Sequence, residues 1–300
     1  MNALTNLLSH PLFMERNSLE AFFQHNAGRI SIDPPKIDRA RLCGSCDDEL
    51  PEPPARYLRV LKYMRLAAPI AEIIVGSDQS VAALNDTAII TFNGPIVKHA
   101  DEWECEIFGL TDLDDIDAAI AAVSADENIR NVLLNFVNCP GGTSIGVAET
   151  ADKVYALAQK KNVFTFSDSF VASAGIYIGS QASQLFVTAS TYSGSIGVII
   201  PAILDFSKNL QMNGITPHII KAGKFKDTGT SLRPPTQEEL DMLDAQIARQ
   251  KAGFDKAVKR GRPAIRTDAM QGQLFVGAEA VEVGLADAVL PDLNAALAQF

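Results

Sequence analysis

The sequence predicts an α/β fold with a mostly parallel sheet. Between residues 87 and 292, short apolar runs typical of strands alternate with longer helical patterns, which indicates repeated βαβ units. The strand-like runs, such as residues 132–137, are apolar almost throughout, which suits a sheet covered by helices on both faces. Right-handed crossovers between such strands make neighbouring strands parallel.

The elements follow in a regular order. The strand at 87–92 ends at a turn, and Thr111 is placed to cap a helix that runs to about residue 124 with several aspartates in its first turn. Further strands are expected at 132–137, 163–166, 185–188, 196–200 and 216–220. Further helices are expected from the turn at 138–142 to about residue 160, after Ser173, and at 203–213, 237–259 and 277–283.

Residues 1–85 differ from the rest of the chain. They contain Pro34-Pro35, a turn-rich stretch at 43–49 and a Pro-rich stretch at 51–54, all of which interrupt regular structure. Helical pieces are expected at 17–25 and 55–66. We therefore predict an N-terminal accessory region with a Pro-rich linker over 1–85, a main domain over 86–292 and a C-terminal tail over 293–300.

Composition excludes several classes of function. The chain has 300 residues, 47% of them apolar, so it can bury a sizeable core. Its net charge of -10 argues against a nucleic-acid binder, because there is no basic excess to neutralise phosphates. No uncharged apolar run is long enough to span a membrane, and the N-terminus has no basic region leading into an apolar stretch. The sequence thus predicts a cytoplasmic protein.

The cysteines do not indicate a metal site or a disulfide framework. Cys43 and Cys46 form one CxxC pair in an acidic stretch, whereas zinc would need a second pair. Cys105 and Cys139 are too scattered to supply it. We expect no metal and no other cofactor.

The segment around Ser173 is the most informative part of the chain. A strand-like run at 163–166 is followed by a small-residue turn that carries Ser173 and opens an apolar helix. A strand, a tight turn with a serine and a helix together aim a hydroxyl at a substrate. The alternative is that Ser173 only caps the helix.

Two glycine turns accompany this serine. Pro140-Gly141-Gly142 lies between a strand and a helix, where glycines allow backbone N–H groups to face an oxyanion. Ser195, in the turn Ser193-Gly194-Ser195, is placed to hydrogen-bond a catalytic partner. Alone, each of these segments would be an ordinary turn.

A serine nucleophile also needs a base. Residues 221–227 contain Lys221, Lys224 and Lys226, and a lysine serves as a base when burial lowers its pKa from about 10.4 toward neutrality. The local sequence does not say which of the three is buried. The histidines are His10, His25, His99 and His218. None of them lies in a glycine-rich context, so a Ser/Lys dyad is favoured over a Ser/His/Asp triad.

These segments, in this order, resemble the signal peptide peptidase A family of Ser/Lys serine peptidases, over about residues 87–292. The matching segments are residues 138–142, 172–175, 193–198 and 223–227, followed by 275–280 and 283–287. The resemblance implies a ClpP/crotonase-like fold and a serine endopeptidase without a cofactor. It implies that Ser173 is the nucleophile, Lys226 rather than Lys224 the base, and Ser195 the residue that orients the lysine. It also implies that the backbone N–H groups of Gly142 and Ala174 form the oxyanion hole.

The resemblance further implies a homo-oligomeric ring in which Lys226 of one subunit serves Ser173 of its neighbour. Two features favour the phage branch of the family. The sequence shows no membrane anchor, and the segments at 10–15 and 19–23 are similar to the opening of phage minor capsid (protein C-type) peptidases, which are head maturation proteases. That branch implies capsid, portal or scaffold proteins as partners, and the host cytoplasm or the procapsid as the location.

Three alternatives remain: a cytoplasmic bacterial peptidase, a catalytically silent capsid or scaffold component, and an acyl-CoA-binding crotonase relative. The Pro-rich stretch at 51–54 is a hypothetical self-cleavage site.

Overall fold

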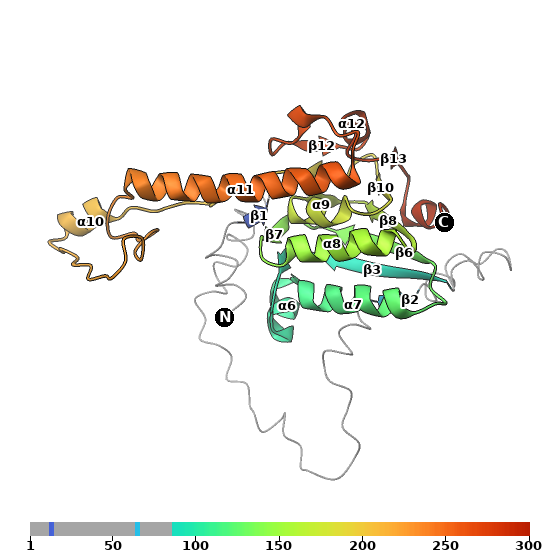
Figure 1. Ribbon diagram of the computed structural model, residues 1–300, viewed down its shortest axis with the longest axis horizontal. Helices are drawn as coiled ribbons and strands as arrows, with labels where there is room; N and C mark the ends of the chain where they lie inside the picture. The colour runs from blue at the N-terminus through green and yellow to red at the C-terminus, as the bar shows by residue number, and fades with distance from the viewer. Residues whose placement is uncertain (1–11, 15–63, 67–85) are drawn as a thin grey trace, which may run out of the picture.

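A six-stranded sheet forms the centre of the protein, in a computed structural model that describes residues 12–14, 64–66 and 86–300 (Figure 1). Its strands are β2 (Met64–Leu66), β3 (Thr87–Asn93), β6 (Asn131–Val137), β8 (Asn162–Ser167), β10 (Gln184–Val187) and β13 (Ala288–Val289). Their order is β13-β10-β8-β6-β3-β2, and only the pair β2–β3 is antiparallel. The predicted α/β fold with a mostly parallel sheet is thus confirmed.

Both faces of this sheet are buried. Alternate residues of each strand contribute to opposite cores: Ile90 and Leu134 to the larger one, Ile89 and Leu133 to the smaller. Helices α7 (Leu113–Ala125) and α8 (Val147–Ala158) cover the larger core. The smaller core is covered by α13 (Leu293–Leu297), a helix within the segment that the sequence set apart as a tail.

Two smaller sheets lie beyond the carboxyl ends of the central strands. One has the order β1-β7-β4-β5 and the other β12-β11-β9. Their strands are β1 (Leu12–Met14), β4 (Ile96–Val97), β5 (Thr111–Asp112), β7 (Gly141–Thr143), β9 (Phe170–Ala172), β11 (Tyr192–Gly194) and β12 (Leu274–Val276). The chain passes directly from β6 to β7, from β8 to β9 and from β10 to β11. The carboxyl ends of three neighbouring parallel strands are where α/β folds place their ligand sites.

The longest helix supports a segment that stands away from this body. The remaining helices are α6 (Glu102–Phe108), α9 (Ala174–Gly179), α10 (Ser207–Met212), α11 (Gln237–Gly261), the 3₁₀ turn η2 (Thr267–Ala269) and α12 (Ala278–Glu282). The C-terminal part of α11 packs on α9, with the rings of Phe254 and Tyr177 stacked at 4.7 Å. Residues 201–236, here called the arm, project from the body near the N-terminal end of α11 (Figure 1). No helix among the described residues is long and apolar enough to cross a membrane.

The arm exposes an unusual amount of apolar surface. Its exposed apolar side chains are Leu204, Phe206, Met212, Ile215, Ile219, Ile220, Phe225 and Leu232. Ile220 is 99% exposed. The described part of one chain leaves these side chains exposed, and a concentration of exposed apolar side chains is typical of an interaction surface.

Several predicted elements are wrong in detail. The expected strands at 196–200 and 216–220 are not strands in the structure, where Ile199 alone takes part in an isolated bridge. Strand composition depends on the surrounding contacts and does not by itself make a strand. The helix expected at 203–213 shortens to α10. Asp112, not Thr111, caps α7, since its carboxylate accepts the backbone N–H of Asp114.

In the N-terminal region, residues 64–66 form strand β2 rather than the end of a helix at 55–66. The helix expected at 17–25, the CxxC pair Cys43 and Cys46, and the stretch at 51–54 lie outside the described residues. The division of the chain at residues 85 and 292 stays a prediction.

Candidate active site

Three of the four predicted motifs meet at the carboxyl end of the central sheet. The turn with Gly141 and Gly142 follows β6, Ser173 follows β9, and Ser195 follows β11. Since β6, β8 and β10 are neighbours, the segments that follow them are neighbours as well.

Backbone hydrogen bonds join these three segments directly. The Cys139 N–H donates to the Phe170 carbonyl at 2.8 Å, and the Ala172 N–H donates to the Cys139 carbonyl at 2.9 Å. The Ser173 N–H donates to the Gly194 carbonyl at 2.9 Å. The candidate nucleophile is therefore held between the two glycine turns.

Ser173 has the conformation of a strained turn. Its φ is +52° and its ψ is -114°, a region that costs a residue with a side chain on the order of 1–3 kcal/mol. The residue is fully buried, and among the described residues its Oγ has no hydrogen-bond partner. It precedes α9 without a side-chain cap hydrogen bond, so the alternative role of a simple helix cap is not the one it has here. A buried, unpartnered hydroxyl costs free energy, and active sites are where such groups are found.

The glycine turn comes close to a neighbouring backbone. A Cβ built on Gly142 would lie 1.9 Å from the Ile96 carbonyl oxygen, in the strand β4 that pairs with β7. Only glycine fits at this position. Ala174 is the first residue of α9, where a backbone N–H has no acceptor within its own helix.

Ser195 lies level with Ser173 in the neighbouring strand. Gly194 is paired with Ala172, so the next residue of each strand is Ser195 and Ser173 respectively. Ser195 is also buried and has a φ of +52°, and its N–H donates to the Gln273 carbonyl at 2.6 Å. Two strained serines thus stand beside each other at the end of the sheet.

Cys139, in the glycine turn at 138–142, is a second candidate nucleophile. Its surroundings make the thiol unreactive. The side chain is fully buried, and a Cβ built on Gly175 would lie 3.0 Å from its Sγ. Burial raises the pKa of the Cys139 thiol to about 12. Since only the thiolate is a good nucleophile, Cys139 is inert near neutral pH.

We therefore expect Cys139 to resist alkylation by iodoacetamide at pH 8.5 in the folded protein. Mass spectrometry of peptides should show it modified only after denaturation, which is the matched control. Rapid modification of Cys139 in the native state, together with loss of activity, would contradict this prediction.

Lys226 is not brought to these three segments within one chain. It lies on the arm with its side chain exposed. Its backbone N–H donates to the Gly223 carbonyl at 3.3 Å, but its ammonium makes no hydrogen bond or ion pair with any described residue. Its two neighbours are engaged: Lys221 pairs with Asp227, and Lys224 pairs with Glu238 at 2.5 Å. Among the three lysines that the sequence left open, Lys226 is the one without a local partner.

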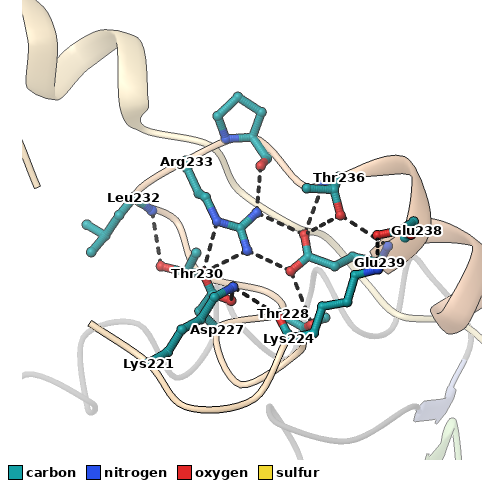
Figure 2. Close-up of polar contacts among 11 residues, drawn as sticks. Lys221, Lys224, Asp227, Thr228, Thr230, Leu232, Arg233, Thr236, Glu238 and Glu239 are labelled. Carbon is teal, nitrogen blue, oxygen red and sulfur yellow. Dashed lines mark hydrogen bonds and ion pairs between the residues drawn. The ribbon is translucent and has the colours of Figure 1, made fainter. Parts of the chain in front are cut away.

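An ion-pair network, here called the arm anchor, fixes the loop that carries Lys226 (Figure 2). Its members are Asp227, Arg233, Thr236 and Glu239. The Arg233 guanidinium donates to Asp227 at 2.7 and 2.9 Å and to Glu239 at 2.6 and 2.9 Å. Glu239 in turn accepts the Thr236 N–H at 2.8 Å in a capping box that begins α11. The residue that follows Lys226 is thereby tied to the start of the long helix.

The charges of the arm anchor keep its carboxylates ionised. Hydrogen bonds from Lys221 and Arg233 lower the pKa of Asp227, and the hydrogen bonds from Arg233 lower the pKa of Glu239. A lowered folded-state pKa stabilises the fold above the unfolded pKa of about 4, and this contribution is lost as the pH falls further. The arm anchor should therefore be unchanged between pH 5 and 9 and weaken only in acid.

We expect Arg233→Ala to release the arm. Removing the guanidinium leaves Glu239 without its cation and breaks the link between Glu239 and Asp227, which keeps only Lys221. Limited proteolysis should therefore cut residues 221–236 several-fold faster at neutral pH. Lys224→Ala is the matched control, because the Lys224–Glu238 pair is exposed on both sides and such pairs contribute little. Equal cleavage rates for the two variants would contradict the role of the arm anchor.

The predicted alternatives to the dyad lie elsewhere. His99 is exposed, with its Nδ1 at 2.5 Å from Asp114, and His218 is exposed on the arm rather than within a strand. His10 and His25 are outside the described residues. Within the described parts of the chain, no group of histidine, cysteine and carboxylate side chains is arranged to hold a metal.

Comparison with known proteins shows similarity to peptidases. Residues 155–298 match the family model "Peptidase family S49", a range that includes Ser173, Ser195 and Lys226. A protease-named protein of Methanocaldococcus jannaschii is 33% identical over 167 residues, which cover 55% of this chain and 53% of its own. The head-tail preconnector protein GP5 of Enterobacteria phage P21 is 27% identical, with 69% and 41% covered. The capsid assembly protease C of Escherichia phage lambda is 24% identical, with 72% and 49% covered.

The chain thus spans about half the length of these relatives. The matches to a protein of Enterococcus faecium named as a signal peptide peptidase and to the capsid assembly protease C confirm the resemblance inferred from the motifs. The observed sheet of βαβ units agrees with the ClpP/crotonase-like fold. The comparisons thus place residues 155–298 in similarity to peptidase family S49.

Proposed function

We propose that this protein is a serine endopeptidase in which Ser173 is the nucleophile and Lys226 the general base. The observation that carries the proposal is the Ser173 hydroxyl, which is buried, unpartnered and held in a strained turn between two glycine turns. A buried hydroxyl without a hydrogen-bond partner can donate to a general base that another subunit supplies.

The chemistry follows from these positions. Neutral Lys226 takes the proton from Ser173 Oγ as the oxygen attacks the peptide carbonyl, and the backbone N–H groups of Gly142 and Ala174 stabilise the oxyanion. The lysine then gives its proton to the leaving amine, and the acyl-enzyme remains. Water, deprotonated by the same lysine, attacks the ester. The lysine returns this proton to Ser173 Oγ as the acid is released. Ser195 orients the lysine through its hydroxyl.

Lys226 reaches Ser173 from a neighbouring copy of the chain. In one chain the lysine is exposed on an arm that projects from the body, and the arm carries eight exposed apolar side chains. Docking of the arm on the next subunit would bury this surface and bring the ammonium into an apolar environment, which disfavours its charged form. Repetition of such a head-to-tail contact closes a ring.

The substrates we propose are capsid, portal or scaffold proteins during phage head maturation. This part of the proposal is supported by the relatives named head-tail preconnector protein and capsid assembly protease, and by the extended glycine edge of β7, which suits a peptide in strand form. The host cytoplasm or the procapsid would then be the site of action.

Labelling with a fluorophosphonate probe tests the dyad. The wild type and Lys224→Ala should be labelled at one site, whereas Ser173→Ala should not be labelled and Lys226→Ala only weakly. Labelling of Ser173→Ala to the wild-type level would refute the nucleophile. An unlabelled wild type in an intact oligomer would instead indicate a catalytically silent capsid component.

A further inference from the structure

The short strand β1 comes from the N-terminal region and pairs with the glycine strand of the candidate site. β1 is antiparallel to β7, with Leu12 opposite Thr143, Phe13 opposite Gly142 and Met14 opposite Gly141. The residue at the centre of this pairing is thus opposite the oxyanion donor proposed above.

We propose that residues 12–14 occupy the edge of β7 on which an extended peptide substrate binds, and that they compete with the substrate for it. This inference rests on the proposed function, because it takes β7 to be the oxyanion strand. It assigns an autoinhibitory role to the N-terminal segment that contains Leu12-Phe13-Met14.

The order of the strands shows why β1 and a substrate would compete for the same edge of β7. In the sheet β1-β7-β4-β5, the other side of β7 is taken by β4, where Ile96 pairs with Gly142. Without β1, β7 would be an edge strand within the described part of this sheet. Such edges present unpaired N–H and C=O groups that an added extended peptide can satisfy.

Residues 12–14 and a substrate peptide cannot pair with this edge of β7 at the same time. The other side of β7 is closed by β4, whose Ile96 carbonyl lies so near Gly142 that even a Cβ would not fit. Two of the three residues of β7 are glycines, so the pairing depends on backbone groups rather than on side-chain pockets. Peptides of many sequences can therefore replace residues 12–14.

The contact is strong enough to compete and weak enough to be displaced. Because β1 belongs to the same chain, its effective concentration at β7 is high without any additional contact. At the same time β1 has only three residues, and a pairing this short is marginal by itself. A protein substrate that engages more of the site can displace it.

A binding assay that needs no catalysis tests the competition. A fluorescent peptide with the sequence of residues 9–17 is titrated into two full-length chains, Ser173→Ala and Ser173→Ala with Phe13→Pro. Proline at position 13 fixes φ and disfavours the paired strand, so the fraction of chains with β1 on the edge of β7 should fall. We expect the second chain to bind the peptide about three- to tenfold more tightly, in proportion to the freed fraction of sites. A peptide with proline in place of Phe13 should bind neither chain.

Kinetics of the active chain give the second readout. Phe13→Pro should lower the KM for a peptide substrate by about three- to tenfold with kcat unchanged, whereas the matched control Phe13→Val, which keeps the N–H, should behave as wild type. Equal KM values for Phe13→Pro and Phe13→Val, or equal peptide affinities of the two Ser173→Ala chains, would overturn the proposal. If no chain hydrolyses any peptide, the proposed function fails, and the binding assay still decides whether residues 12–14 compete for β7.

Discussion

Mixing Ser173→Ala chains with Lys226→Ala chains is expected to restore peptidase activity that neither variant has alone. Each variant by itself should lose activity on the order of 10⁴-fold or more, since nucleophile and base act as a unit. In a mixed ring, the serine comes from a Lys226→Ala subunit and the lysine from a neighbouring Ser173→Ala subunit. With equal amounts and random assembly, about one quarter of the sites should hold both groups. The exposed arm that carries Lys226 is the structural reason for this expectation.

Hydrolysis of a fluorogenic peptide after subunit exchange measures the recovery. A chain carrying both substitutions, mixed with either single variant, is the matched control and should restore nothing. Mass spectrometry of intact oligomers must show that mixed assemblies have formed. Mixed rings without any recovered activity would mean that Ser173 and Lys226 of the same chain work together, and the arm would have to fold back on its own body.

Replacing Phe136 with alanine should cost the fold about 3–5 kcal/mol, as for other fully buried phenylalanines. Phe136 is 0% exposed and stacks on Phe92 with ring centroids 4.3 Å apart. Cβ atoms built on Gly175 and Gly179 would lie 3.5 and 3.1 Å from its ring, so it also supports α9 from below. Urea unfolding monitored by circular dichroism measures the loss.

Leu204→Ala is the control for this prediction, because Leu204 is 58% exposed on the arm and its truncation should change stability by less than about 0.5 kcal/mol. The Phe136 variant should also show reduced probe labelling at Ser173 under conditions where it remains folded. A loss of stability no larger than that of the control would show that Phe136 does not hold α9 in place.

The parts of the fold that the sequence predicted are those with strong local signals. The apolar strands β3, β6, β8 and β10 and the long helix α11 carry clear patterns, and all were expected close to their observed bounds. The strands β9 and β11 were not expected, because three residues are too few for a periodic pattern. Residues 196–200 and 216–220 have the composition of strands, but within the described part of the chain neither segment forms one. Such segments cannot be assigned from local composition.

The sequence predicted the glycine and serine turns of the candidate site, but not the contacts that hold the loop with Lys226. Glycine turns and a serine turn are recognisable in sequence, and the structure places all three together. The arm anchor was missed: Thr236 and Glu239 follow the pattern of a capping box, but nothing local marks Arg233 as the residue that joins Asp227 to Glu239. Which lysine serves as base was left open by the residues alone, because local sequence does not show which ammonium becomes buried.

The length of α11 has a consequence for the size of the assembly. Its 25 residues span about 37 Å, with the C-terminal part fixed to the body and the N-terminal end attached to the arm. In the proposed ring, this helix would act as a spacer that sets the distance between two active centres. Adding or removing one helical turn in its exposed half would change that reach by about 5 Å while leaving every catalytic group intact. In the proposed ring, the diameter, and with it the width of a central pore, would thus depend on the number of turns of α11.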